Sequence, residues 1–258
     1  MDHVHVHIPY PSVGDYLPLL REKKLNLELY FSAASLDSLK TGDIALLIER
    51  LDYGPSLSIH APFMDLSPGA VDDRVREVTV RRFSQVLDIA EVLSPKAIVF
   101  HSGYEKWKYA HRVDLWLEAS IRTWRPLRER AALIGTRLVI ENIFEDKPSN
   151  LELLMQELHS ESFGLCFDTG HCNLFSKVPL GDWLDSLGPY LQEFHVHDND
   201  GTFDSHLPVG DGTFDFGLLF SRMEKRDYVF TVEAHTPERV IKSLERLTKY
   251  LALSPDKR

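Results

Sequence analysis

The chain has 258 residues, with 29 Lys and Arg against 39 Asp and Glu, so its formal net charge is -10 with histidine neutral. This acidic balance argues against a nucleic-acid binder that relies on a continuous basic patch, because such binding comes mainly from Lys and Arg displacing counterions from phosphates. With 43% hydrophobic and 26% charged residues, the composition indicates a globular protein with a sizeable core rather than a disordered chain.

Short runs rich in Val, Ile, Leu and Phe alternate with longer amphipathic stretches along the chain. The short runs predict eight strands, at residues 4–8, 25–31, 57–60, 97–101, 137–141, 164–168, 192–197 and 228–233. The stretches between them predict helices, among them residues 71–93, 114–133, 150–158, 179–191 and 237–251. In the first of these, three- and four-residue spacings place on one face Val71, Val75, Val78, Val86, Ala90 and Leu93.

Eight strand–helix units in a chain close to the ~250 residues usual for the architecture predict an α/β fold of the (β/α)8 TIM-barrel type. A doubly wound open sheet is the alternative. It would need a glycine-rich phosphate turn after the first strand, and the sequence HIPYPSVGDY is not one. Because there is no linker, low-complexity segment or further repeat, we expect a single TIM-barrel domain over residues 1–258.

Cysteine content and hydropathy predict a cytoplasmic protein. The two cysteines, Cys166 and Cys172, are too few for a disulfide framework. No run approaches the roughly 20 apolar residues that span a bilayer, and the opening MDHVHVHIPY has no basic segment before a long apolar run. We therefore expect no membrane partner, and a homo-oligomer stays open as an alternative to a monomer.

Six successive predicted strands end on residue types that bind metals. These residues are His60 in SIHAPF, His101 in IVFHSGY, Glu141 in LVIENIF, Asp168 in LCFDTGH, His195 in EFHVHDND and Glu233 in FTVEAH. The active site of such a barrel lies at the C-terminal ends of its strands. A single buried His or Asp is often a capped turn or a hydrogen-bonded core residue. Six at one rim favour a shared explanation, a cage of carboxylates and imidazoles around a divalent metal.

The spacing within three motifs adds to this picture. In DTGH, His171 follows Asp168 by three residues, so both side chains are expected over the rim from one turn. In HVHDND, the strand period of two places His195 and His197 on the same side, although the second residue is close to the loop. DSHLPVGDG carries Asp204 and His206 two residues apart, with a solvated loop as the alternative interpretation.

The ordered set HAP, HSG, EN, DTGH, HVHDND, DSHLPVGDG and VEAH resembles the xylose isomerase-like TIM-barrel superfamily. That superfamily includes divalent-metal sugar isomerases and epimerases and the endonuclease IV-type apurinic-site endonucleases. The resemblance implies that the single metal of the epimerase branch is held by Glu141, Asp168, His195 and Glu233. It implies that the further ligands of the three-zinc endonuclease branch are His60, His101, His171, Asp204 and His206.

By the same resemblance, a first metal would lie between His60, His101 and Glu141, and a third between His171, Asp204 and His206. Two departures from the endonucleases leave the substrate open. The sequence IENIFEDKPSN follows Glu141 where they have a glycine-rich continuation, and Phe63 stands where they carry a tyrosine. The chain also looks short of the loops with which those enzymes grip DNA.

The leading hypothesis is a divalent-metal isomerase or epimerase of a sugar or sugar phosphate, with Glu141 and Glu233 exchanging the proton as base and acid. The alternative is hydrolysis of an apurinic site or another phosphodiester by a cluster of two or three metals. A non-catalytic ligand-binding barrel is a third possibility, although such barrels usually lose a ligand. The expected cofactor is zinc or manganese, one to three ions, and the expected partner is a small carbohydrate rather than nucleic acid.

Four further residues are candidates for contact with that substrate. His7 ends the first strand, where HVHVH alternates onto one face and only His7 is expected near the rim. Phe63 and Trp107 follow strand ends, where aromatic rings stack on sugars or simply anchor loops. Glu28, within the strand LNLELYF, is expected either to contact substrate or to pair inside the barrel.

Overall fold

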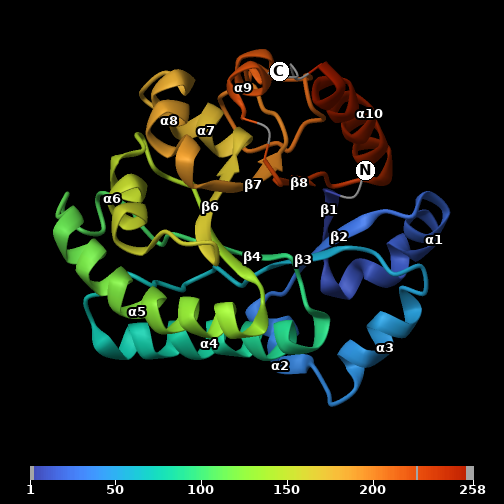
Figure 1. The fold of residues 1–258 in the computed structure, drawn as a ribbon, viewed down its shortest axis with the longest axis horizontal. Coiled ribbons are helices and arrows are strands. Elements are labelled where there is room, and N and C mark those ends of the chain that lie inside the picture. The colour runs from blue at the N-terminus through green and yellow to red at the C-terminus, as the bar shows by residue number, and fades with distance from the viewer. Residues whose placement is uncertain (1–2, 225, 254–258) are drawn as a thin grey trace.

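The computed structural model describes residues 3–224 and 226–253 and contains a closed barrel of parallel strands (Figure 1). In chain order the strands are β1 (Val4–Pro9), β2 (Asn26–Tyr30), β3 (Leu57–His60), β4 (Ala97–His101), β5 (Arg137–Glu141), β6 (Phe163–Asp168), β7 (Leu191–Val196) and β8 (Val229–Val232). Pairing of β1 with β8 closes the barrel. The predicted (β/α)8 class is confirmed, and the closure excludes the open doubly wound sheet.

Helices surround the barrel on its outside (Figure 1). They are α1 (Val13–Lys23), α2 (Ala33–Ser38), α3 (Asp43–Arg50), α4 (Asp73–Leu93), α5 (Val113–Ile134), α6 (Ser149–Leu158), α7 (Thr169–Phe175), α8 (Leu180–Leu187), α9 (Phe216–Arg222) and α10 (Pro237–Leu253). The helix expected over residues 179–191 is shorter than predicted. It ends at Leu187, a 3-10 turn covers Gly188–Tyr190, and Leu191 already begins β7.

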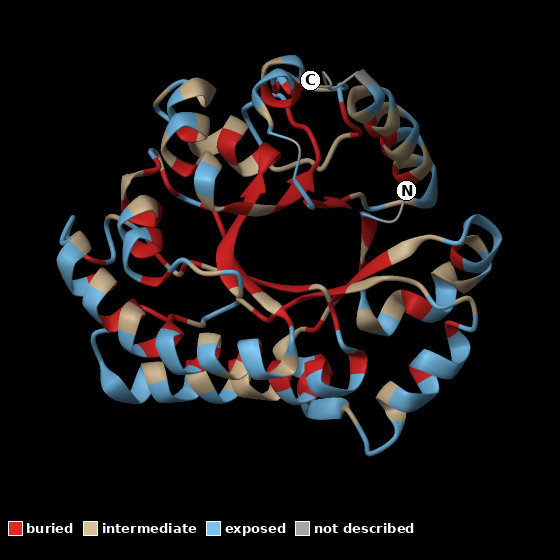
Figure 2. Ribbon diagram, viewed as in Figure 1, coloured by how far each residue is buried: buried red, intermediate tan, exposed pale blue. Residues whose placement is uncertain are grey.

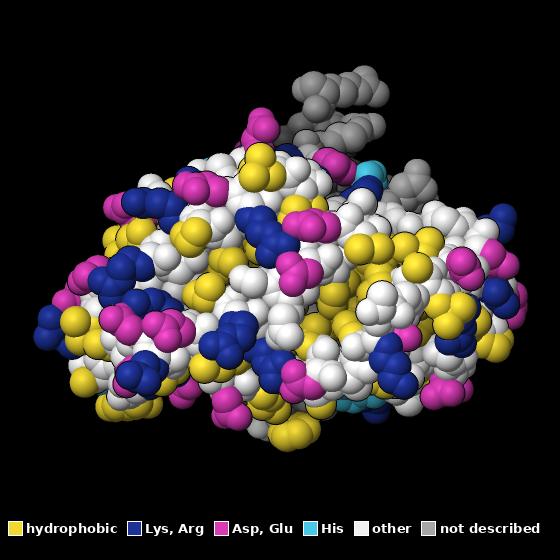
Figure 3. All heavy atoms as spheres, turned by 90° about the horizontal axis from the view of Figure 1, so that it is seen from below, with side chains coloured by type: hydrophobic (Ala, Val, Ile, Leu, Met, Phe, Trp, Pro, Cys, Tyr) yellow, Lys and Arg dark blue, Asp and Glu magenta, His cyan; other side chains and the backbone are white. Residues whose placement is uncertain are grey.

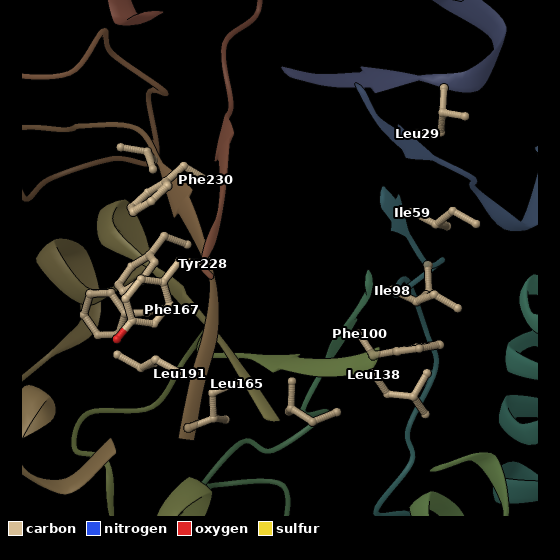
Figure 4. Close-up of a cluster of buried hydrophobic side chains, with 14 of the residues drawn as sticks. Leu29, Ile59, Ile98, Phe100, Leu138, Leu165, Phe167, Leu191, Tyr228 and Phe230 are labelled. Atoms are coloured by element: carbon tan, nitrogen blue, oxygen red, sulfur yellow. The ribbon is translucent and has the colours of Figure 1, made fainter. Parts of the chain in front are cut away.

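The apolar core lies between the strands and the helices. Figure 2 shows the strands as buried and the outer faces of the helices as exposed, and the side chains labelled in Figure 4 are spread around the barrel from β2 to β8. Along β4, Ile98 and Phe100 belong to this layer, while Ala97 and Val99 belong to a small separate cluster with residues of β5 and β6. Successive strand residues therefore alternate between the outer core and the barrel interior.

The apolar face predicted for the helix over residues 71–93 is correct only in its second half. Phe83, Val86 and Ala90 of α4 are buried, but Val75 and Val78 are 45% and 52% exposed. Val71 lies before the helix, which is capped by the Asp72 side chain accepting from the Arg74 N–H. Hydrophobic spacing identifies a face of a helix, but it does not say which turns of that face have a surface to pack against.

One face of the molecule carries charged side chains of both signs. On the face seen in Figure 3, Lys and Arg side chains are interspersed with Asp and Glu. Within residues 3–224 and 226–253, no helix combines the length and the apolar character needed to cross a membrane.

Candidate metal centre

The six predicted strand-end residues meet at one end of the barrel. His101 is in register with Glu141 across β4 and β5, and Asp168 with His195 across β6 and β7. A cavity of about 960 Å³ opens at this end. Nine residues are candidate metal ligands from the sequence, and all of them except Asp168 and His195 line this cavity. These two are fully buried.

A first group consists of two histidines around one glutamate oxygen. Glu141 Oε2 lies 3.3 Å from His60 Nε2 and 3.4 Å from His101 Nε2. The Nδ1 atom of His60 lies 2.9 Å from the Ala61 carbonyl oxygen, which only accepts, so Nδ1 carries the ring proton. In the neutral ring, Nε2 then directs a lone pair at the glutamate. A cation between the two atoms would satisfy both.

A second group is centred on His195 and joins three carboxylates. The Nδ1 atom of His195 lies 3.2 Å from Glu233 Oε1, 3.6 Å from Glu141 Oε1 and 3.9 Å from Asp168 Oδ2. It is buried without a hydrogen-bond partner in the part of the chain that the structure describes. Its other nitrogen lies 3.3 Å from Glu28 Oε2. The donor set fits a divalent metal, because converging buried carboxylates need a positive charge among them.

The electrostatics of this group point the same way. Burial on its own would raise the pKa of Glu141 and Glu233, but the neighbouring histidines hold both below the ordinary glutamate range, Glu233 at about 2. Burial on its own would lower the pKa of His195, but the charges around it, those of the carboxylates included, raise it well above the usual value. Protons on the imidazoles thus take the place of a cation, which is the competition expected at a metal site.

A third group lies around Asp204, on the loop between β7 and α9. Asp204 Oδ2 is 3.2 Å from His206 Nε2 and 3.5 Å from His171 Nε2. Burial opposes ionisation of Asp204, but the hydrogen bonds from both histidines bring its pKa far below the usual value. The structure therefore brings together the residues of each of the three metal sets that the resemblance implies.

Local sequence explains how these side chains are held. Asp168 caps α7 by accepting the His171 N–H at 2.6 Å, so the DTGH motif holds both side chains from one turn. The loop that carries Asp204 and His206 is anchored to Asp198, whose carboxylate accepts the N–H groups of residues 199, 210, 212 and 214. A Cβ at Gly212 would lie 2.1 Å from the carbonyl oxygen of residue 199, which accounts for glycine there.

The four substrate candidates occupy different positions. His7 lines the cavity, with its Nδ1 2.9 Å from Glu28 Oε1 and 3.3 Å from Glu233 Oε1. Phe63 also lines it and stacks on His101 with ring centroids 4.2 Å apart. Glu28 is fully buried and pairs inside the barrel, one of its two expected roles. Trp107 is 76% exposed and packs edge-on against His111, outside the cavity lining.

Sequence reasoning missed several residues at this site. Tyr30 ends β2 in register with His60 and lines the cavity, and its place at a strand end was a usable signal. Tyr16 and His235 line it from α1 and from the turn after β8. His197 had been placed on the same side as His195, but its burial among ligands of two groups was not expected.

Comparisons with known proteins give one family model and several similar proteins. A family model described as xylose isomerase-like TIM barrel matches residues 28–250. The uncharacterized protein MJ1311 of Methanocaldococcus jannaschii is 28% identical over 225 residues, which cover 83% of this chain and 77% of that protein. The TTHB071 protein of Thermus thermophilus, soaked with ZnCl2, is 30% identical with a TM-score of 0.81, and a D-tagatose 3-epimerase-like protein is 26% identical with a TM-score of 0.80. Each of these two alignments covers 98% of both chains.

Proposed function

Because this chain belongs to the xylose isomerase-like TIM-barrel family, we propose that it is a divalent-metal-dependent isomerase or epimerase of a sugar or sugar phosphate. One observation carries the proposal. The oxygens of Glu141, Asp168 and Glu233 lie within 3.9 Å of one nitrogen, Nδ1, of His195. A mixture of imidazole and carboxylate ligands suits zinc or manganese better than magnesium.

The cavity above this group supports a small polar substrate. Its volume of about 960 Å³ is at the upper end of the range typical for small-molecule sites. The rings of Tyr16, Tyr30, Phe63 and Phe144 line its walls, and such rings pack against the C–H faces of sugars. Seven of the candidate metal ligands line the same cavity, so a substrate on these walls would present its oxygens to them.

A divalent cation in the second group would polarise adjacent carbonyl and hydroxyl oxygens of the substrate and acidify the C–H bond between them. Glu141 and Glu233 both reach the cavity, and each has one oxygen that does not face His195. For Glu233 this is Oε2, which lies 3.5 Å from His206 Nδ1. We assign one glutamate to removing the substrate proton and the other to returning it.

The number of metals decides whether Glu141 can take this role. Its Oε1 faces His195, and its Oε2 lies between His60 and His101. With a metal only in the second group, Oε2 remains available for a proton. With a further metal between His60 and His101, both oxygens are engaged, and hydrolysis by a metal cluster becomes the better description. All three groups of candidate ligands converge in the structure, so the experiment must also test hydrolysis by a metal cluster.

Metal content and substrate turnover should therefore be measured together. The protein would be purified without chelator, its metals counted by elemental analysis, and ketoses, aldoses and their phosphates screened for epimerised or isomerised products. One metal that supports turnover, with solvent deuterium entering the product at carbon, is the expected result. Cleavage of an abasic-site oligonucleotide or a simple phosphodiester, without conversion of any sugar, would overturn the proposal in favour of hydrolysis.

The Glu233→Gln variant tests the assigned proton transfer. It keeps an oxygen for the metal but cannot exchange a proton, so we expect turnover to fall about 10²- to 10⁴-fold with metal still bound. Glu105→Gln is the matched control, because Glu105 also lines the cavity but is exposed and lies outside the three groups. Full turnover by metal-loaded Glu233→Gln would exclude Glu233 from the proton transfer.

A further inference from the structure

One wall of the cavity is built by the loops that follow β3 and β4. Residues 63–66 of the first loop and residues 102–105 and 108 of the second line it. The wall begins beside the first group of candidate ligands, because Phe63 stacks on His101 with ring centroids 4.2 Å apart. The residues of this wall belong to none of the three ligand groups, so the metal chemistry leaves them without a role.

The two loops are fixed against each other and against α5. A Cβ at Gly103 would lie 2.7 Å from Cδ of Pro68, so the loops are in close contact. The Trp116 Nε1–H donates to the carbonyl oxygen of Ser102 at 3.1 Å, and the Tyr104 ring packs edge-on against the same indole with centroids 5.2 Å apart. The wall is therefore formed before a ligand enters, which lowers the entropic cost of binding there.

The side chains of this wall match the two kinds of surface that a sugar presents. Phe63, Met64 and Leu66 offer apolar groups to its C–H faces. The Lys108 ammonium has three N–H donors, and one of them goes to the buried Ser67 hydroxyl at 3.0 Å. Within the described residues no other hydrogen bond engages it. Two donors therefore remain for the hydroxyl oxygens of a bound molecule.

The charge of the wall disfavours a phosphate. Lys108 is the single lysine or arginine among the described residues that line the cavity. The carboxylates of Asp65 and Glu105 belong to the same wall. A phosphate would meet two carboxylates for one ammonium, and juxtaposed like charges oppose binding. A neutral group that carries hydroxyls is the better occupant.

The volume of the cavity exceeds what one monosaccharide fills. A water molecule takes up about 30 Å³ of the liquid, so the cavity of about 960 Å³ has room for about thirty waters. A hexose has about twelve non-hydrogen atoms, and because bonded atoms lie closer together than free waters, it displaces no more than about twelve of them. One hexose at the metal-ligand groups therefore leaves more than half of the cavity to another unit.

We propose that the loops after β3 and β4 form a second subsite, which takes a neutral sugar unit joined to the sugar that reaches the metal-ligand groups. The substrate is then a disaccharide or another glycoside, rather than a free or phosphorylated monosaccharide. The inference rests on the proposed sugar chemistry for the unit at the metal, but the second subsite only binds. Lys108 is a specificity residue in this arrangement, because it contacts the unit that does not react.

Calorimetric titration of the metal-loaded protein tests the subsite. Maltose, cellobiose, lactose and lactulose would be compared with their reducing-end units, D-glucose and D-fructose, and with D-fructose 6-phosphate. We expect at least one disaccharide to bind at least about 10-fold more tightly than its reducing-end unit, since a hydrogen bond from a charged donor supplies that much. Lys108→Met should remove most of this gain and leave the monosaccharide constants unchanged. Lys147→Met, at an exposed lysine outside the cavity lining, is the matched control.

Three results would overturn the second subsite. The first is that no disaccharide binds more tightly than its reducing-end unit. The second is that Lys108→Met weakens monosaccharides and disaccharides equally. The third is that D-fructose 6-phosphate binds most tightly and loses this advantage in Lys108→Met, which would put a phosphate in place of the neutral unit.

Turnover in D₂O separates this inference from the proposed function. A disaccharide that binds through Lys108 but takes up no deuterium at carbon would support the subsite and contradict the proposed chemistry. Conversion of a monosaccharide, without preference for any disaccharide, would support the chemistry and overturn the subsite. In crystals soaked with the preferred disaccharide, we expect a hydroxyl oxygen of the second unit within hydrogen-bond distance of Lys108 Nζ, and a second unit pointing away from both loops would contradict the assignment.

Discussion

The Nε2 atom of His195 lies 3.3 Å from the buried carboxylate of Glu28, on the opposite side of the ring from the three carboxylates of the rim. Glu28 accepts the proton of Nε2, so Nδ1 keeps the lone pair that a metal requires. The same glutamate accepts from His7 at 2.9 Å. A strand that contributes no ligand of its own thus determines which nitrogen of His195 faces the cavity.

Replacing Glu28 should weaken metal binding without removing a ligand. In Glu28→Gln the side-chain amide can present its N–H₂ to His195, which favours the wrong tautomer. We expect the dissociation constant for zinc or manganese to rise about 10- to 100-fold, as for other residues that orient metal ligands. Competition with a chromophoric chelator measures this, and Glu22→Gln, on the exposed face of α1, is the control. An unchanged constant would show that Glu28 does not orient His195.

The free energy of unfolding of the metal-free protein should pass through a maximum as the pH is varied. Bound metal should widen the pH range over which the protein is most stable. His171 and His195 have a pKa well above their usual value, so their contribution is present below about pH 6.5 and is lost as the pH rises through the raised pKa. The pKa of Glu233 is about 2 rather than 4.5, so its contribution is present above pH 4.5 and is lost as the pH falls toward 2. Urea unfolding in the presence of chelator should show the free energy of unfolding falling at both acidic and alkaline pH. Zinc should flatten the alkaline decline, and rising stability from about pH 7 to about pH 9 in chelator would contradict this account.

The contact between Gly170 and His197 should make Gly170→Ala destabilising. The added methyl group would lie 2.0 Å from the ring, and neither α7 nor the buried ring can move freely. Overpacking of this kind costs about 1–3 kcal/mol in the free energy of unfolding. Gly188→Ala is the matched control, because a Cβ there has no heavy atom within 4 Å. Equal unfolding midpoints for the two variants in urea would show that His197 accommodates the methyl group.

The loop that carries Asp204 depends on one buried carboxylate. Asp198 accepts four backbone N–H groups from that loop, and hydrogen bonds to charged groups contribute about 1.5–3 kcal/mol each. Asp198→Ala should therefore reduce the free energy of unfolding by about 3 kcal/mol or more and expose residues 199–213 to proteases. Asp200→Ala, at an exposed position on the same loop, should do neither. Hydrogen exchange of the loop amides separates local opening from global unfolding, and unchanged exchange in Asp198→Ala would remove Asp198 from this role.

The barrel and its strand-end residues could be predicted because both follow from the order of apolar and polar residues over short stretches of the sequence. Eight apolar runs at regular spacing allow few parallel arrangements, and parallel strands end at the same rim. A polar residue that ends each run is therefore placed near the others without knowledge of any distance. The convergence of Glu141, Asp168 and His195 follows from topology alone.

Contacts that cross the barrel could not be predicted in this way. The pairing of Glu28 with His195 joins residues 167 positions apart, and nothing local distinguishes an inward glutamate that touches substrate from one that supports a ligand. The exposure of Val75 and Val78 likewise depends on where the neighbouring surface ends. His197 was assigned its side of the strand but not its partners, because these are set by the turn after β6 and the loop after β7.

The clearance between residue 170 and residue 197 also constrains how sequences of this kind diverge. The glycine of DTGH and the second histidine of HVHDND belong to different strand–helix units, but the ring of one occupies the space that a side chain of the other would need. We therefore expect the two positions to vary together. A side chain at 170 should be tolerated better once the residue at 197 is smaller, so loss of the histidine before the glycine is the less costly order.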